Sequence, residues 1–211
     1  MATSTPALSY RQQLLALLAR ISFRLGQFTL SSGGTSDYYI DCRTTTLHAE
    51  GGRLTGHAVL ELLIEHGILD QGLEAIGGLT MGADPIVCNV ATASACRALN
   101  ADGTTPGSPL IHGFLVRKAE KTHGTERRIE GFFREGARVV IVDDVCTTGA
   151  STINAIHAAR EAGMVVAAVV CLVEREEANG RPAVEAAADG VPFFAMFTAR
   201  DVRAEHLQQA S

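Results

Sequence analysis

A run of β-branched residues leads directly into two adjacent aspartates and a turn that contains glycine. Residues 139–142 read Val-Val-Ile-Val, Asp143-Asp144 and Val145-Cys146 follow, and residues 147–151 read Thr-Thr-Gly-Ala-Ser. A continuous β-branched run is typical of a strand buried on both faces, which occurs mainly in parallel sheets. A helical pattern from about residue 151 to 162 comes next. The string therefore predicts that both carboxylates lie at the carboxyl edge of a parallel sheet, where α/β folds bind ligands.

Strand-length apolar runs and helical patterns alternate along the rest of the chain. Beyond 139–142, we expect buried strands at residues 75–79, 110–116, 165–173 and 193–197, and short strands around a glycine-rich turn at 26–41. We expect helices from the start signal Ser4-Thr5-Pro6 through residue 21, and at 50–66, 84–99, 181–188 and 200–208. This alternation predicts an α/β fold with a mainly parallel sheet flanked by helices. With 211 residues, and only the short loop 101–109 resembling a linker, one domain over residues 1–211 is expected.

Charge and composition exclude several classes of protein. The chain has 23 acidic and 18 basic residues, a net charge of -5, which argues against a dedicated nucleic-acid binder. Its longest apolar run, residues 165–173, is too short for a membrane helix, and the N-terminus lacks the pattern of a secretory signal. The five cysteines form no CxxC pair, which argues against a disulfide framework or zinc site. We expect a cytoplasmic protein with reduced, mostly buried thiols and no membrane or nucleic-acid partner.

The turn after the aspartates has the composition of a phosphate-binding turn. Backbone N–H groups of residues 147–151, together with the N-terminus of the following helix, suit a phosphate, and Thr147, Thr148 and Ser151 add hydroxyl donors. Asp143 and Asp144 would repel a phosphate, so they fit better as acceptors for sugar hydroxyls or as indirect Mg²⁺ ligands. The order of residues is neither that of a Walker A loop nor GxGxxG.

A basic segment lies within this acidic chain. Residues 117–134 hold six of the 18 basic residues and three acidic ones. A solvated charged loop is one interpretation. The alternative is a mobile basic loop, which suits a small anionic ligand better than a long polyanion.

Together these features resemble one family of enzymes. The aspartate pair with the turn 147–151 resembles the ribose-phosphate pattern of the type I phosphoribosyltransferases. Residues 117–124, RKAEKTHG, resemble the flexible catalytic loop of orotate phosphoribosyltransferases, and so do residues 28–41 and the Glu-Arg-Glu-Glu of residues 174–177. The resemblance covers roughly residues 20–205. The phosphate turn is shared by the whole superfamily, whereas the loop and residues 36–41, SDYYID, are far more specific.

The resemblance implies a fold and a reaction. It implies the type I phosphoribosyltransferase fold, with a small hood formed by about residues 1–45 and the C-terminal segment, and a flexible loop at about 117–131. It implies transfer of the 5-phosphoribosyl group from PRPP to orotate with Mg²⁺, which gives orotidine 5'-monophosphate and pyrophosphate in pyrimidine biosynthesis. It also implies a homodimer with two shared sites, in which the loop reaches the neighbouring site.

The resemblance also assigns roles to individual residues. Catalytic roles fall to Lys121, Arg117, His123 and Asp144. PRPP binding falls to Thr80, Met81, Arg117, Lys118, Lys121, His123, Asp143, Asp144, Val145, Cys146, Thr147, Thr148, Gly149, Ala150 and Ser151. Orotate binding falls to Tyr39, Ile40, Thr147 and Arg175, with Arg175 near the carboxylate because a guanidinium pairs well with a planar carboxylate. Mg²⁺ is held mainly through PRPP, with Asp143 or Asp144 as a further ligand through water.

Two positions depart from the family pattern. Some members carry a pyrophosphate-binding lysine where this chain has Ser31, and another at the glycine-rich strand end where it has Met81. We therefore expect PRPP affinity to depend more on residues 117–123. Two alternatives remain: a phosphoribosyltransferase for another nucleobase, which the Arg175 assignment opposes, and a PRPP-sensing regulator without turnover, which the intact loop and acidic charge oppose.

Overall fold

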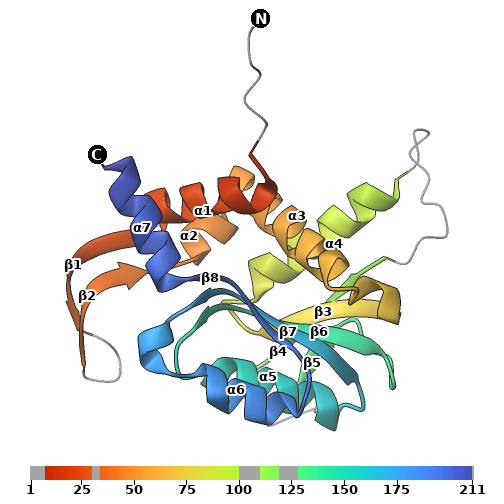
Figure 1. The fold of residues 1–211 in the computed structure, drawn as a ribbon. Coiled ribbons are helices and arrows are strands. Elements are labelled where there is room, and N and C mark those ends of the chain that lie inside the picture. The colour runs from red at the N-terminus through yellow and green to blue at the C-terminus, as the bar shows by residue number, and fades with distance from the viewer. Residues whose placement is uncertain (1–7, 30–33, 100–109, 119–127, 211) are drawn as a thin grey trace, which may run out of the picture.

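A six-stranded sheet forms the centre of the computed structural model, which describes residues 8–29, 34–99, 110–118 and 128–210 (Figure 1). Its strand order is β5-β4-β3-β6-β7-β8. The strands are β3 (Leu73–Leu79), β4 (His112–Val116), β5 (Ile129–Gly131), β6 (Arg138–Cys146), β7 (Val165–Glu174) and β8 (Phe193–Thr198). Only β5 pairs antiparallel, with β4. The expected α/β class with a mainly parallel sheet is confirmed.

Helices cover both faces of this sheet. Figure 1 shows α5 (Ala150–Glu161) and α6 (Arg181–Ala188) beneath it. On the opposite side lie α1 (Tyr10–Ile21), α2 (Arg43–Thr46), α3 (Ala49–Glu65), α4 (Asp84–Ala98) and α7 (Ala199–Gln209). Each layer buries its own apolar cluster against the sheet. Because β6 and β7 are covered on both faces, residues 139–142 of β6 and 165–173 of β7 are continuous apolar runs.

A separate two-stranded sheet lies beside the helical layer. β1 (Phe23–Thr29) and β2 (Thr35–Ile40) pair antiparallel. The C-terminal helix α7 packs against α1 and β1, so the two ends of the described chain meet at this hairpin (Figure 1). That residues 1–211 form one domain, with a hood from about residues 1–45 and the C-terminal segment, stays a prediction. Among the described residues, no helix combines the length and apolar character needed to cross a bilayer.

Two expected boundaries were wrong. Helix α1 begins at Tyr10 rather than after Ser4-Thr5-Pro6, because Ser9 caps it and Gln12 completes a capping box. Strand β6 continues through Cys146, four residues beyond the β-branched run, since its pairing with β7 persists to Glu174. Both aspartates therefore belong to the strand itself.

The sequence patterns did not predict the shortest elements of the fold. The short strand β5, the single-turn helix α2 and the 3₁₀ turns η1 (Leu69–Gln71) and η2 (Glu176–Ala178) lack the length that gives a detectable period. The expected loop 101–109 lies outside the described residues. Three of the five cysteines are buried, and Cys88 and Cys96 are exposed on α4.

Candidate active site

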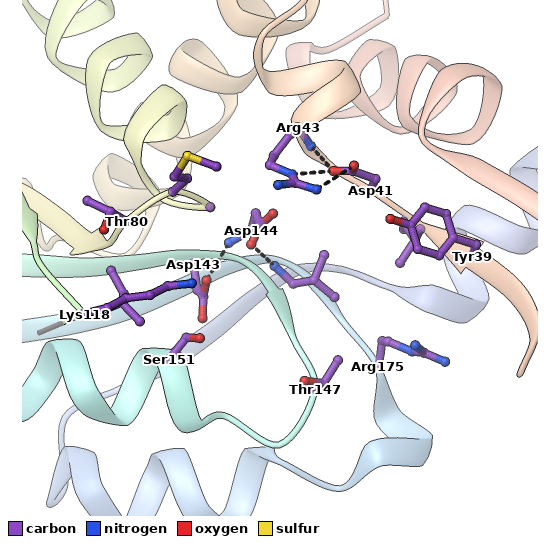
Figure 2. A pocket seen from close by; sticks show the side chains of 15 residues that line it. Tyr39, Asp41, Arg43, Thr80, Lys118, Asp143, Asp144, Thr147, Ser151 and Arg175 are labelled. Carbon is purple, nitrogen blue, oxygen red and sulfur yellow. Dashed lines mark hydrogen bonds and ion pairs between the residues drawn. The ribbon is translucent and has the colours of Figure 1, made fainter. Parts of the chain in front are cut away.

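A pocket of about 350 Å³ opens at the carboxyl ends of β3 and β6 (Figure 2). Residues from β2, α2, the β3–α4 turn, the β4 end, the β6–α5 turn and the β7 end line it together. They are Tyr39, Ile40, Asp41, Arg43, Leu79, Thr80, Met81, Gly82, Lys118, Asp143, Asp144, Val145, Thr147, Ser151 and Arg175. This is the sheet edge at which open α/β folds bind ligands.

The two aspartates at the end of β6 form one wall of this pocket. Asp143 is only 5% exposed, and the Thr152 hydroxyl donates a 2.7 Å hydrogen bond to its Oδ2. The backbone N–H of Asp144 donates to Asp143 Oδ1, and that of Val145 donates to Asp144 Oδ1, each at 3.0 Å. Burial raises the pKa of Asp143 to about 7, and burial also raises the pKa of Asp144. The pair therefore binds protons more readily than exposed aspartates.

The turn after β6 leads into a helix N-terminus without a side-chain cap, and the first N–H groups of a helix have no partner within the helix. Gly149 has φ 78° and precedes α5, whose N-terminus receives no side-chain cap. Thr147 and Ser151 line the pocket, whereas Thr148, Gly149 and Ala150 contribute no lining side chain. Free N–H groups at a helix N-terminus attract anions. The strand, turn and helix follow one another as expected, with Thr147 on the turn and Ser151 in the first turn of α5 (Figure 2), and phosphate binding there stays a prediction.

Cys146 lies in the same string but faces away from the pocket. Its side chain is buried in the apolar cluster between the sheet and α5, so its predicted contact with PRPP is not formed by the thiol. A hydrogen bond with the Cys171 thiol lowers the pKa of Cys146. Neither cysteine is placed to act as a nucleophile in the pocket.

The turn after β3 lines the pocket beside Asp144. Thr80, Met81 and Gly82 all line the pocket, as expected for the first two. The backbone N–H of Thr80 donates to the Val116 carbonyl at 2.9 Å, and the Thr80–Met81 peptide bond is cis. A Cβ at Gly82 would collide with the Asp144 carboxylate, which explains the glycine. The Met81 side chain is exposed and carries no charge.

Arg175 lines the pocket, but its guanidinium is held by the β1–β2 hairpin. Its side chain is 10% exposed. Nε donates to the Tyr38 hydroxyl at 2.9 Å and to Glu177 at 3.0 Å, and Nη2 donates to the Ser36 hydroxyl at 3.2 Å. The guanidinium carbon also lies 4.6 Å from the centre of the Tyr38 ring. Figure 2 shows this guanidinium pointing away from the aspartates, toward the side of Tyr39.

Tyr38 and Glu177 form a second layer behind Arg175. The Tyr38 hydroxyl donates to the Glu177 carboxylate. Burial, together with that carboxylate, raises the pKa of Tyr38 to about 12, so the phenol stays protonated. Tyr39 and Ile40, the predicted orotate-binding residues on β2, reach the pocket from the same hairpin.

The sequence patterns did not predict an ion pair between Asp41 and Arg43. Asp41 accepts hydrogen bonds from Arg43 Nε at 2.8 Å and Nη2 at 2.9 Å, and both residues line the pocket. The Arg43 hydrogen bonds lower the pKa of Asp41 and raise that of Arg43, so both stay ionised near neutral pH. The only sequence signal was their place directly after the DYYI run.

The basic segment is represented in the structure by its two ends. Lys118 lines the pocket, as expected. Arg117 does not line it, and its guanidinium pairs with Glu130 at 3.6 Å. The predictions for Lys121 and His123 fall on residues 119–127, which lie outside the described residues, as does the departure at Ser31.

The described residues include no cluster of three or more histidine, cysteine, aspartate or glutamate side chains that could hold a metal by themselves. Magnesium keeps several waters and is often bound by one or two carboxylates plus substrate phosphates. Asp143 and Asp144 fit such an indirect role.

The chain is similar to known proteins in both sequence and structure. No family model matches the chain. Orotate phosphoribosyltransferase from Corynebacterium glutamicum is 40% identical over 192 residues, 91% of this chain and 93% of the relative. The Streptomyces coelicolor orotate phosphoribosyltransferase is 42% identical over 169 residues, 80% of this chain and 84% of the relative.

Two solved structures are informative. The Mycobacterium tuberculosis orotate phosphoribosyltransferase in complex with PRPP is similar with a TM-score of 0.69 and 33% identity, over 92% of this chain and 98% of that one. Adenine phosphoribosyltransferase from Rhodothermus marinus, with a TM-score of 0.57 and 20% identity over 89% of this chain and 99% of that one, shares the fold alone.

Proposed function

The chain belongs to the orotate phosphoribosyltransferase family, and we propose that the pocket at the ends of β3 and β6 is its active site. The enzyme transfers the 5-phosphoribosyl group from PRPP to orotate in pyrimidine biosynthesis. The observation that carries the assignment is the juxtaposition of Asp143 and Asp144 with the uncapped N-terminus of α5 in one pocket.

PRPP fits this pocket with its 5'-phosphate at the turn 147–151. The free N–H groups and the hydroxyls of Thr147 and Ser151 bind the phosphate oxygens. The carboxylates of Asp143 and Asp144 accept hydrogen bonds from the ribose hydroxyls, which places C1 of the sugar near the centre of the pocket. The hydrogen bond from Thr152 fixes the orientation of Asp143.

Orotate fits between β2 and the end of β7. Tyr39 and Ile40 cover the flat ring, Thr147 contacts its edge, and Arg175 recognises the carboxylate. The present contacts of the Arg175 guanidinium use Nε and Nη2. The orotate carboxylate therefore either binds the remaining N–H groups or replaces part of the contact with Glu177. A base without a carboxylate gains nothing from this cation, which is the physical ground for selecting orotate.

The chemistry needs stabilisation of departing charge more than a nucleophilic side chain. Positive charge develops on the ribose while pyrophosphate leaves with its electron pair, so the site must exclude water and neutralise the leaving group. We assign this work to Lys121, Arg117, Lys118 and His123 of the basic segment, which closes over the pocket as a loop. Mg²⁺, when bound to the diphosphate, supplies further charge neutralisation, and Asp143 or Asp144 holds its water ligands.

The remaining assignments concern the assembly and location of the enzyme. We propose one domain over residues 1–211 and a homodimer in which the basic segment of one subunit reaches the neighbouring pocket. We also propose that the enzyme works in the cytoplasm, in line with its acidic charge and its cysteines, none of which is in a disulfide.

The decisive assay follows ultraviolet absorbance with PRPP and Mg²⁺, and compares orotate with uracil, hypoxanthine and adenine. Consumption of orotate alone supports the assignment. Turnover of another base, or PRPP binding without any turnover, contradicts it. Lys121→Ala should change PRPP affinity by no more than about tenfold yet lower kcat much more, because its charge acts as pyrophosphate departs.

A further inference from the structure

We infer that Arg43 binds the diphosphate of PRPP and supplies the cation that the Thr80–Gly82 turn lacks. The inference rests on the proposed function, because it takes the pocket to be the PRPP site. It assigns substrate contact to a residue that the sequence pattern left without a role.

The charges that line the pocket point to this residue. Among the described residues that line it, three are cationic, Arg43, Lys118 and Arg175, and three are carboxylates. The Arg175 guanidinium is bound by Tyr38 of the β1–β2 hairpin and by Glu177 of η2. Lys118 is an exposed residue at the start of the basic segment. Arg43 is thus the described cation whose guanidinium lies on the Asp144 side of the pocket (Figure 2).

Arg43 lies beside the turn in question. Arg43, Asp41 and Met81 together line both the main pocket and an adjoining hollow of about 560 Å³. The turn offers the uncharged Met81 side chain there. The Arg43 guanidinium and the Asp144 carboxylate are close enough for the positive charge to oppose the rise in the pKa of Asp144. A diphosphate that extends from C1 of a ribose held by Asp144 would enter this space.

Asp41 orients the guanidinium without using all of its donors. A guanidinium has five N–H donors, and the carboxylate of Asp41 accepts from Nε and Nη2. The two Nη1 donors and one Nη2 donor remain free to bind phosphate oxygens. The planar guanidinium can bind two such oxygens at once. The side chain is 44% exposed, so an entering substrate can reach it.

Arg53 provides a matched control. It is also 44% exposed, and it also forms a two-bond pair with a carboxylate, that of Glu50 on the same helix. It does not line the pocket. Arg43→Gln and Arg53→Gln therefore remove the same charge and the same kind of pair, and they differ in access to the substrate.

Calorimetry on the two variants and the wild type, with Mg²⁺, measures binding of PRPP, inorganic pyrophosphate and orotidine 5'-monophosphate. Arg43→Gln should weaken PRPP and pyrophosphate binding about tenfold to a hundredfold, the range for a lost charged hydrogen bond, and leave the nucleotide within about twofold. Arg53→Gln should leave all three unchanged. Adding Met81→Lys to Arg43→Gln should restore part of the PRPP affinity.

Equal weakening of PRPP and orotidine 5'-monophosphate by Arg43→Gln would overturn the inference, because a structural role of the Asp41 pair affects both. Unchanged PRPP and pyrophosphate binding would overturn it as well. The proposed function is tested separately by orotate turnover in the wild type. Failure there, with selective loss of pyrophosphate binding in Arg43→Gln, would contradict the orotate assignment and leave the role of Arg43 supported.

Discussion

Thr152→Val removes the hydrogen bond that fixes the buried aspartate of the site. The Thr152 hydroxyl is 2.7 Å from Asp143 Oδ2, and the two residues are 1% and 5% exposed. Valine keeps the shape and deletes the donor. A buried hydrogen bond to a charged group contributes about 1.5–3 kcal/mol, so we expect a loss of about 2–3 kcal/mol in the free energy of unfolding when Asp143 is ionised. For a chain of this size that corresponds to a fall of about 4–12 °C in Tm.

The size of this loss should depend on pH. Because burial raises the pKa of Asp143 to about 7, the folded protein holds a proton that the unfolded chain releases at lower pH. The contribution of Asp143 to wild-type stability therefore falls as pH rises from about 4 to about 7 and levels off above that range. The Thr152 hydroxyl favours the ionised carboxylate, so its loss costs most above pH about 7 and drops to about 1 kcal/mol where the carboxyl is neutral.

Thr55→Val is the matched control. Thr55 is buried and donates a 2.7 Å hydrogen bond to the Gly51 carbonyl, a neutral acceptor. Its loss should cost about 0.5–1.5 kcal/mol at every pH. Urea unfolding of both variants at about pH 5.5 and about pH 8.5 measures the difference. Equal losses at the two pH values for Thr152→Val, or a loss at about pH 8.5 no larger than that of Thr55→Val, would refute the reasoning.

Two further predictions concern substrate binding. Glu177→Gln weakens the hold on Arg175 that keeps its guanidinium in place, so KM for orotate should change several-fold while KM for PRPP stays within about twofold, as steady-state kinetics would show. A larger effect on PRPP would argue against the assigned role of Arg175. Gly149→Ala places a Cβ against Val184 at φ 78°, whereas Gly136→Ala at φ 74° meets open space. Both incur the strain of a left-handed residue, about 1–2 kcal/mol, but only Gly149→Ala should also reduce PRPP affinity, measured by calorimetry. Equal PRPP affinities in the two variants would show that the phosphate turn tolerates the shift.

The sequence was most informative where neighbouring residues share one environment. The central strands lie between two helical layers, so residues 139–142 of β6 and 165–173 of β7 are continuous apolar runs that the sequence shows without knowledge of the neighbouring strands. The predicted phosphate turn is likewise local, because a strand, a turn and a helix N-terminus follow one another in the chain. The ends of elements were less predictable, since the last four residues of β6 are held by pairing with β7 rather than by their own composition.

The positions of the cationic side chains in the pocket, in contrast, could not be predicted from the local sequence. Arg175 lies in a Glu-Arg-Glu-Glu run that reads equally well as a surface ion pair, and its burial depends on Tyr38, 137 positions away. Arg43 sits on a single-turn helix without a detectable period, beside a methionine from another segment. Charge at an active site is set by the sum over all segments that meet there, so a missing lysine in one motif can be replaced by an arginine from another. From the sequence alone, Met81 in place of a lysine does not tell whether another residue neutralises the diphosphate. The pocket shows a specific candidate for that role, Arg43.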